Sequence, residues 1–274
     1  MWYISIYIFR LFIQKGTVMP AKIIAVANQK GGVAKTTTTF NLAAVKAMQG
    51  KRVLMIDLDP QASLTIACGI EPGEDRLGGY STIDLFDRKS DVLETAFKVN
   101  GMEKETFLFV VPSDPGLSVT ETKIATAELK EYFIKDACEV FDSHFDYIFL
   151  DCPPNLGPFV VNALVAANEV IIPVKTDYLS FRGLELILES IAKVKASKRL
   201  NPDIVTKGVV ATMYRKRTKD HQDILAMLDK TATLLGVVKE SVEASKGDVD
   251  GIPVVVSNPK SDVARSYFEI AEKI

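Results

Sequence analysis

The fold is decided by one stretch near the N-terminus, Ile23 to Thr37, which reads IIAVANQKGGVAKTT. The apolar run 23–27 predicts a buried strand, and residues 36–48 carry apolar side chains at helical spacing. Glycines in the turn between them let backbone N–H groups point inward, and the N-terminus of the next helix attracts anions. The stretch therefore predicts a loop that binds phosphate groups. A plain glycine turn without a ligand is the alternative.

The residue types of the loop suggest which groups it binds. Lys35 is expected to reach the β- and γ-phosphates of a nucleotide, and the Thr36 hydroxyl to bind Mg²⁺. The usual pattern has a glycine where this chain has Gln29, and Ala34 also replaces a glycine. The Ala34 methyl group is a small intrusion provided that its φ is negative, so we expect ATP binding to survive with altered affinity. The predicted nucleotide-binding residues are Lys30, Gly31, Gly32, Val33, Ala34, Lys35, Thr36 and Thr37.

Two further strands are predicted to end in carboxylates. The apolar run 53–56 is followed by Asp57 and Asp59, which face the same side of an extended segment. Pro60 then ends the strand. The run 147–150 ends in Asp151. Carboxylates at strand ends beside a phosphate loop can hold Mg²⁺ and orient the attacking water. A solvated turn with two acids is the alternative for Asp57 and Asp59.

Short apolar runs and longer amphipathic segments alternate along the rest of the chain. Further strands are expected at 107–111, 170–174 and 208–212, and helices at 125–141, 158–167, 181–198 and 220–228. Apolar strands separated by helices predict a doubly wound α/β fold, with a mostly parallel sheet covered by helices on both faces. Ligands of such folds bind at the carboxyl ends of the strands.

Composition limits the organisation of the chain. Its 274 residues, 47% of them hydrophobic, suit one domain, which we place at 21–274 after an N-terminal extension at 1–20. The net charge of −2 gives no global attraction to nucleic acid, so any DNA contact must come from a local basic patch. Cys68, Cys138 and Cys152 lie far apart and are interpreted as buried thiols of a reducing compartment.

The first thirteen residues leave two interpretations open. Met1 to Ile13 are mostly apolar, but this run is shorter than the roughly 20 residues of a membrane span. Either the start is assigned too early and the native chain begins near Met19, or the segment is an amphipathic anchor. We expect no stable membrane anchor.

The phosphate loop resembles the deviant Walker A loop of the ParA/MinD superfamily, whose extra lysine corresponds to Lys30. The resemblance runs from about Ala21 to the C-terminus and includes the DxDPQ element at 57–61 and the D-[YF]-I-x-x-D-x-P-P strand at 146–154. It implies that Lys30 reaches phosphates bound by the other subunit of an ATP dimer. It also implies catalytic roles for Lys30, Lys35 and Asp59, the last positioning the hydrolytic water. The metal-side residues it implies are Thr36, Asp57 and Asp151.

Chain length and Asp-Pro-Gln favour the ParA/Soj-type partition ATPases within this superfamily. That resemblance implies a cytoplasmic, nucleoid-associated ATPase that binds nonspecific DNA as an ATP dimer and is stimulated by a ParB-like partner. The predicted DNA-binding cluster is Arg215, Lys216, Arg217 and Lys219. Lys193, Lys195, Lys198 and Arg199 form a second cluster, whose cations could equally complement a helix dipole.

One segment departs from the family pattern. Residues 239–241 replace the family's P-R-N, and Glu243 stands where an arginine is given to DNA binding. DNA contact would then shift to Arg217, Lys219 and Lys246, or the protein would act on another surface. Two other classes stay open: a MinD-like membrane positioner that uses the N-terminal segment, and a metabolic enzyme with a related loop. For the latter, the cysteines do not match the cluster-binding pair of the nitrogenase iron protein, and a dethiobiotin synthetase would lack the element at 57–61 followed by the basic cluster at 215–219.

Overall fold

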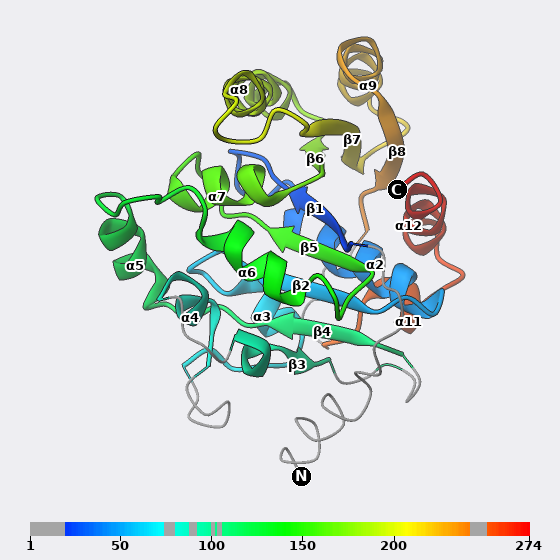
Figure 1. Cartoon of the computed structure of the whole chain (residues 1–274). Helices are drawn as coiled ribbons and strands as arrows, with labels where there is room; N and C mark the ends of the chain where they lie inside the picture. Colours follow the sequence, from blue (N-terminus) through cyan, green and yellow to red (C-terminus); the bar gives the residue numbers. More distant parts are fainter. Residues whose placement is uncertain (1–19, 74–79, 88–91, 100–101, 103–105, 242–250) are drawn as a thin grey trace.

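An eight-stranded sheet forms the centre of the protein, and its strand order is β3-β4-β2-β5-β1-β6-β7-β8 (Figure 1). The computed structural model describes residues 20–73, 80–87, 92–99, 102, 106–241 and 251–274. Only β3, at one edge, runs antiparallel to its neighbour among the described strands. The strands are β1 (Lys22–Val26), β2 (Val53–Asp57), β3 (Phe97–Lys98), β4 (Leu108–Val111), β5 (Tyr147–Asp151), β6 (Glu169–Lys175), β7 (Val205–Tyr214) and β8 (Leu234–Lys239).

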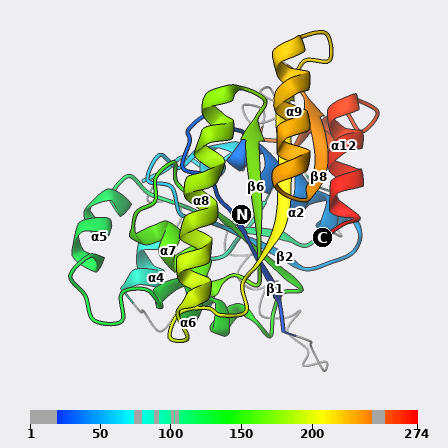
Figure 2. The same cartoon turned by 90° about the horizontal axis from the view of Figure 1, so that it is seen from above.

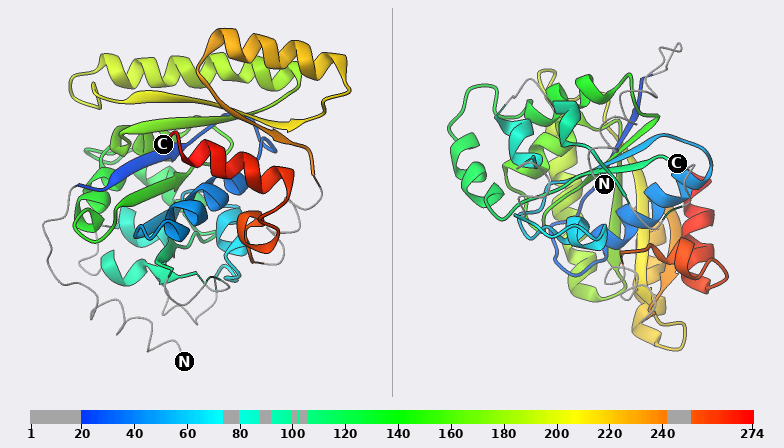
Figure 3. Two further views of the ribbon diagram at one scale, coloured as in Figure 1. Left: turned by 90° about the vertical axis from the view of Figure 1, so that its right-hand side faces the viewer. Right: turned by 90° about the horizontal axis from the view of Figure 1, so that it is seen from below.

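Helices cover both faces of the sheet, as the doubly wound prediction required (Figure 3). One face carries α2 (Lys35–Met48), α3 (Ser63–Ala67), α11 (Val254–Ser257) and α12 (Asp262–Ala271). The other carries α4 (Thr82–Phe86), η2 (Val92–Thr95), α5 (Leu117–Ile124), α6 (Phe133–Phe141), α7 (Pro158–Ala166), α8 (Tyr178–Ala196) and α9 (Lys219–Thr231). From above, α8 and α9 run beside each other over the β6–β8 side of the sheet (Figure 2). The predicted fold class is confirmed.

The position of β1 decides where a ligand can bind. It lies between β5 and β6 and is parallel to both. Strands β2 to β5 lie on one side of β1, and strands β6 to β8 lie on the other. In β2 every residue is buried, because helices shield both faces. The carboxyl ends of β1, β2 and β5 therefore meet at one edge, at the point where the strand order reverses.

One predicted helix is wrong. Residues 125–141 were expected to form a single helix, but the structure has α5 ending at Ile124 and α6 beginning at Phe133. Leu129, between them, has a φ of 52°, a left-handed conformation that a continuous right-handed helix cannot contain. The other predicted strands and helices are present with boundaries shifted by a few residues. The elements that were not predicted are β3, β8, α3, α4, η2, α5, α11 and α12.

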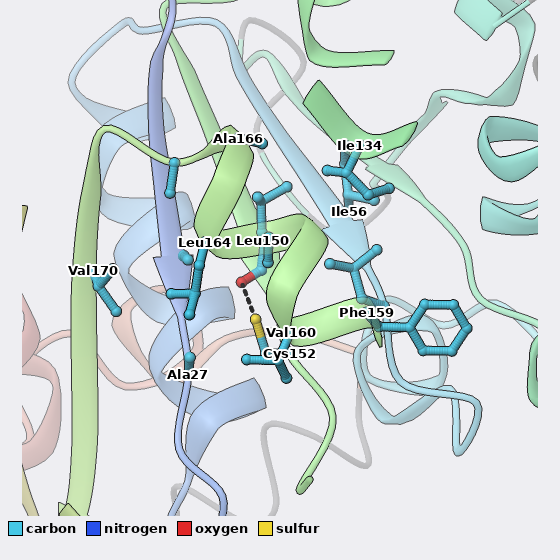
Figure 4. Close-up of a cluster of buried hydrophobic side chains, with 14 of the residues drawn as sticks. Ala27, Ile56, Ile134, Leu150, Cys152, Phe159, Val160, Leu164, Ala166 and Val170 are labelled. Atoms are coloured by element: carbon cyan, nitrogen blue, oxygen red, sulfur yellow. Dashed lines mark hydrogen bonds between the residues drawn. The ribbon is translucent and has the colours of Figure 1, made fainter. Parts of the chain in front are cut away.

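The three cysteines are buried free thiols, as expected. Cys152 follows β5 and packs among apolar side chains of α7 such as Val160, and its thiol donates to the Leu150 carbonyl at 3.8 Å (Figure 4). Burial raises the pKa of this thiol above its usual value, so it is protonated at neutral pH. Among the residues that the structure describes, no helix is long and apolar enough to cross a membrane.

Gly208 offers a test of the packing around β7. A β-bulge interrupts the pairing of β6 and β7 there, and a Cβ on Gly208 would lie 2.4 Å from the Thr233 carbonyl oxygen and 2.9 Å from Leu235 Cγ. Because backbone atoms cannot move aside cheaply, Gly208→Ala is expected to lower the free energy of unfolding by roughly 3 kcal/mol.

The matched control is Gly50→Ala, since Gly50 has a φ of 78° but nothing within 4 Å of its added Cβ. It should cost only the left-handed strain, about 1 kcal/mol. Urea denaturation measures both values, and equal costs would contradict the steric argument.

Candidate active site

The phosphate loop runs from the end of β1 to the start of α2 and is held by hydrogen bonds of two polar side chains, Asn28 and Thr212. Asn28 is buried; its Nδ2 donates to the Pro173 carbonyl at 2.7 Å, and its Oδ1 accepts from the Lys30 N–H at 3.0 Å. Thr212 Oγ1, on β7, donates to the Val33 carbonyl at 3.1 Å. The loop is thus fixed to β6 and β7. Neither Asn28 nor Thr212 was identified from sequence, because their partners are far away along the chain.

Ala34 has a backbone conformation that glycine normally supplies. Its φ and ψ are 65° and 37°, and it occupies the N-cap of α2. The condition under which its methyl group would be a small intrusion, a negative φ, is therefore not met. A left-handed conformation costs a non-glycine residue about 1–2 kcal/mol. The loop therefore carries that strain in its backbone.

The two loop lysines have different surroundings. Lys35 is 7% exposed, and its Nζ donates to the Lys30 carbonyl at 3.1 Å. Burial lowers the pKa of Lys35, and the nearby charge of Asp151 opposes that shift. Lys30 keeps about a third of its side chain exposed, and its Nζ lies 3.8 Å from Asp177 Oδ1 at the N-cap of α8. Lys35 therefore points within its own loop, whereas Lys30 lies at the surface.

Asp151 joins the sheet to the first turns of α2. It is fully buried at the end of β5; Thr36 Oγ1 donates to its Oδ2 at 2.8 Å, and Thr39 Oγ1 donates to its Oδ1 at 3.1 Å. The structure thus brings together the hydroxyl and the carboxylate that the sequence predicted on the Mg²⁺ side. Thr39 was not predicted; it lies three residues after Thr36 and hence on the same face of the helix.

Asp57 is directly opposite Asp151 in the pairing of β2 with β5. Its Oδ2 accepts from both the Thr65 N–H, at 2.9 Å, and the Thr65 hydroxyl, at 2.7 Å. Its Oδ1 accepts from the Asp59 N–H at 3.1 Å. These three hydrogen bonds from the surrounding chain therefore occupy most of the acceptor capacity of the Asp57 carboxylate. A metal-linked role for Asp57 stays a prediction. Asp59 itself is partly exposed, and its Oδ1 accepts from the Gln61 N–H at 3.0 Å.

Two buried acids side by side give this site an unusual electrostatic state. Burial raises the pKa of Asp57 to about 6, against the hydrogen bonds from Thr65. Burial and then the charge of Asp57 raise the pKa of Asp151 to about 8, against the hydrogen bond from Thr36 and the charge of Lys35. A cation at this edge would favour the ionised form of both carboxylates.

The predicted DNA-binding cluster lies in the turn after β7 and at the first residue of α9. All four of its members, Arg215, Lys216, Arg217 and Lys219, are exposed. Arg215 differs from the rest because its guanidinium forms a two-bond ion pair with Glu240, at the end of β8, with Nη2 2.9 Å from Oε1. This pair neutralises one charge of the cluster. Glu243 and Lys246 lie outside the described residues.

The geometry defines a class of protein. The parts of a P-loop nucleotide-binding fold are present: a strand, a glycine-containing loop, a helix that begins with a buried lysine and a threonine, and an acid at the end of the neighbouring strand. No group of three His, Cys, Asp or Glu side chains among the described residues could hold a metal alone.

Comparisons with known proteins identify the family. A family model described as an AAA domain matches residues 21–206. The sporulation initiation inhibitor protein Soj of Bacillus subtilis is 35% identical over 92% of this chain and 98% of its own length. The chromosome partitioning protein ParA of Caulobacter vibrioides is 31% identical over 93% of this chain and 94% of its own. The chain belongs to the ParA/Soj family.

Solved structures show the same fold. A cobyrinic acid a,c-diamide synthase from Mycobacterium smegmatis, crystallised with ADP and magnesium, is 32% identical with a TM-score of 0.75, over 92% of this chain and 93% of that one. McdA of Cyanothece has a TM-score of 0.81 over 92% of this chain and 98% of that one. At 22% identity, McdA shows the fold alone. The predicted family resemblance is confirmed, whereas the roles of individual residues stay predictions.

The strain at Ala34 predicts that its removal stabilises the protein. Ala34→Gly is expected to raise the free energy of unfolding of the nucleotide-free protein by about 1 kcal/mol, since the left-handed strain exceeds the entropy that glycine adds to the unfolded chain. Chemical denaturation measures the change.

Leu129→Gly is the control, because Leu129 has a similar φ of 52° but is exposed and far from the loop in sequence. Both variants should gain stability, and only Ala34→Gly should change nucleotide affinity. A loss of stability in Ala34→Gly would contradict the strain.

Proposed function

We propose that this protein binds ATP with Mg²⁺ and hydrolyses it at the phosphate loop. The observation that carries the proposal is the hydrogen bond from Thr36 to the buried Asp151 at the start of α2. Thr36, Asp151 and Asp57 offer hard oxygen donors, which fit Mg²⁺. Mg²⁺ bound with a nucleotide usually takes its remaining ligands from phosphate and water, so a cluster of three acids is not required. Bound there, the ion would neutralise charge on the phosphates.

A cavity beside the loop has room for the nucleoside. Its volume is about 510 Å³, and Ala34 and Thr37, from the phosphate loop and the start of α2, line one part of it. Met213, Glu240 and Tyr267 line other parts of it. Cavities of roughly 300–1,000 Å³ hold small ligands. The cavity opens where β7 and β8 end, so one nucleotide could lie in the cavity and the loop together.

We propose further that ATP joins two copies of the chain. Lys35 is enclosed by its own loop, whereas Lys30 is at the surface, where a second subunit could meet it. In the dimer, Lys30 would leave Asp177 and approach the phosphates of the partner, which would neutralise charge that develops in the transition state. Lys35 would hold the phosphates of its own subunit, and Asp59 would orient the attacking water.

The dimer is proposed to act on the nucleoid as a partition or positioning switch that binds DNA without sequence preference. The names of Soj and ParA relatives support this role. Lys216, Arg217 and Lys219 form an exposed basic turn at the edge of the sheet that carries the loop, and dimerisation would double it. Partner stimulation by a ParB-like protein belongs to the same proposal.

One observation favours a second candidate, because the diamide synthase of known structure is 32% identical to this chain. A synthase would use ATP without any DNA contact, so the DNA experiment below separates the two classes. The MinD-like alternative depends on residues 1–13, which lie outside the described residues. The terminal helix α12 packs its apolar side chains, including Tyr267 and Ile270, into the core beside α2.

Asp59→Ala tests the switch. The variant is expected to bind ATP, to lose at least about 99% of its hydrolysis because the water is no longer oriented, and to elute as a dimer in gel filtration with ATP. Asp203→Ala, an exposed acid remote from the loop in sequence, is the control and should behave as wild type. A monomeric Asp59→Ala protein with ATP bound would contradict the cross-subunit role of Lys30.

The basic turn is tested by replacing Lys216, Arg217 and Lys219 together with alanine. ATP-dependent retention on nonspecific DNA should weaken uniformly across sequences. The dependence of log K on log salt should flatten by about 0.9 for each DNA phosphate that the variant no longer neutralises. The matched variant removes three charges from the end of α8 and the residues just after it, at Lys193, Lys195 and Lys198. If the α8 variant fails to bind DNA and the basic-turn variant still binds, the DNA lies against α8. If the wild-type protein binds DNA equally well with ADP and with ATP, the switch is contradicted.

A further inference from the structure

Ser113 is a buried residue that belongs to no recognised motif. It forms a hydrogen bond with Asp59, in the segment after β2. It follows β4 and Pro112, and it is 2% exposed. Its Oγ donates to the Asp59 carbonyl at 2.7 Å, and its N–H donates to Thr65 Oγ1, also at 2.7 Å. One residue after β4 is thereby bonded to two places in the segment after β2.

Thr65 connects Ser113 to Asp57. Its hydroxyl donates its one proton to Asp57 Oδ2 at 2.7 Å and accepts from the Ser113 N–H on the other side. Thr65 is fully buried, and its own N–H donates to the same carboxylate oxygen. Because these polar groups are buried, each of the bonds is costly to leave unmade.

The result is a closed circuit of hydrogen bonds that joins the Asp59 backbone to Asp57, Thr65 and Ser113. Asp57 Oδ1 accepts from the Asp59 N–H at 3.1 Å, and Ser113 Oγ donates to the Asp59 carbonyl. That carbonyl also accepts from the Ala62 N–H at 2.8 Å, a bond within the local turn. The Ser113 bond differs because it ties Asp59 to the segment after β4, 54 residues further along the chain.

This circuit fixes the backbone from which the Asp59 side chain projects. The Asp59 carboxylate is partly exposed, and the hydrogen bond that it accepts from the Gln61 N–H is local. Its placement relative to the phosphate loop therefore depends on the orientation of its peptide. A displacement of about 1 Å in a group that orients a reactant can cost on the order of a hundredfold in rate.

We propose that Ser113 is a positioning residue for ATP hydrolysis, which holds the Asp59 backbone so that the Asp59 carboxylate faces the attacking water. The inference rests on the role given to Asp59 under the proposed function. Ser113 does not touch the nucleotide in this scheme; it acts through Asp59. The rate of the chemical step should therefore depend on Ser113, and ATP affinity should not.

The experiment compares Ser113→Ala with wild type in single-turnover ATP hydrolysis, with protein in excess, and in equilibrium binding of Mg-ATP. The hydrolysis rate constant is expected to fall by about tenfold, since one of three bonds to the Asp59 peptide is removed, while the ATP Kd stays within about twofold. Ser118→Ala is the matched control, because the exposed Ser118 hydroxyl donates to the Pro115 carbonyl at 2.8 Å in the same region. It should leave both quantities unchanged.

Ser113→Thr keeps the donor and is expected to recover most of the rate, which a purely structural loss would not allow. The proposal is overturned if Ser113→Ala hydrolyses ATP within twofold of wild type. It is also overturned if affinity falls as much as the rate, or if threonine fails to restore the rate. Asp59→Ala separates the two levels: if that variant hydrolyses normally, the proposed function fails, and if it is inactive while Ser113→Ala is normal, only the role of Ser113 fails.

Discussion

Asp151 accepts hydrogen bonds from Thr36 and Thr39, and through them the first turns of α2 are joined to the carboxyl end of β5. The geometry of the phosphate loop depends on this contact, because the loop has to span from β1 to a helix whose start is fixed. The parallel register of β1 with β5 pairs Val26 with Asp151, so the end of one strand faces the acid of the next. Loop, helix and acid therefore form one unit.

The same edge of the sheet contains groups whose backbone conformation or burial costs free energy. Ala34 is left-handed without being glycine, and Asp57 and Asp151 are buried acids with raised pKa values. Strain and buried charge concentrate at functional sites, where the surrounding structure holds them in place. Here the surrounding structure includes Asn28 and Thr212, which fix the loop, and Thr65, which binds Asp57. An arrangement of this kind favours a site that is completed by a nucleotide and a cation.

Sequence reasoning found the parts of the site that repeat a local pattern. Lys35 and Thr36 follow a glycine turn, and Asp57 and Asp151 end apolar strands, so their meeting could be expected from the parallel sheet alone. It could not find Asn28, Thr39 or Ser113, whose partners Pro173, Asp151 and Asp59 lie far away along the chain. It also misjudged 125–141, because amphipathic spacing continues across the turn that breaks the helix at Leu129. The ion pair of Arg215 with Glu240 could not be predicted from the sequence either, since 25 residues separate the two along the chain.

The loop sequence by itself determined the fold class, the family and the expectation of a bound phosphate, because strand, glycine turn and helix start are set by neighbours along the chain. Only the tertiary structure decided that Ala34 is left-handed, that Lys35 is enclosed while Lys30 is not, and that Ser113 holds Asp59. These features depend on hydrogen bonds and burial between segments tens of residues apart. A periodic pattern in sequence specifies which face of an element is buried, but not which atom it will meet.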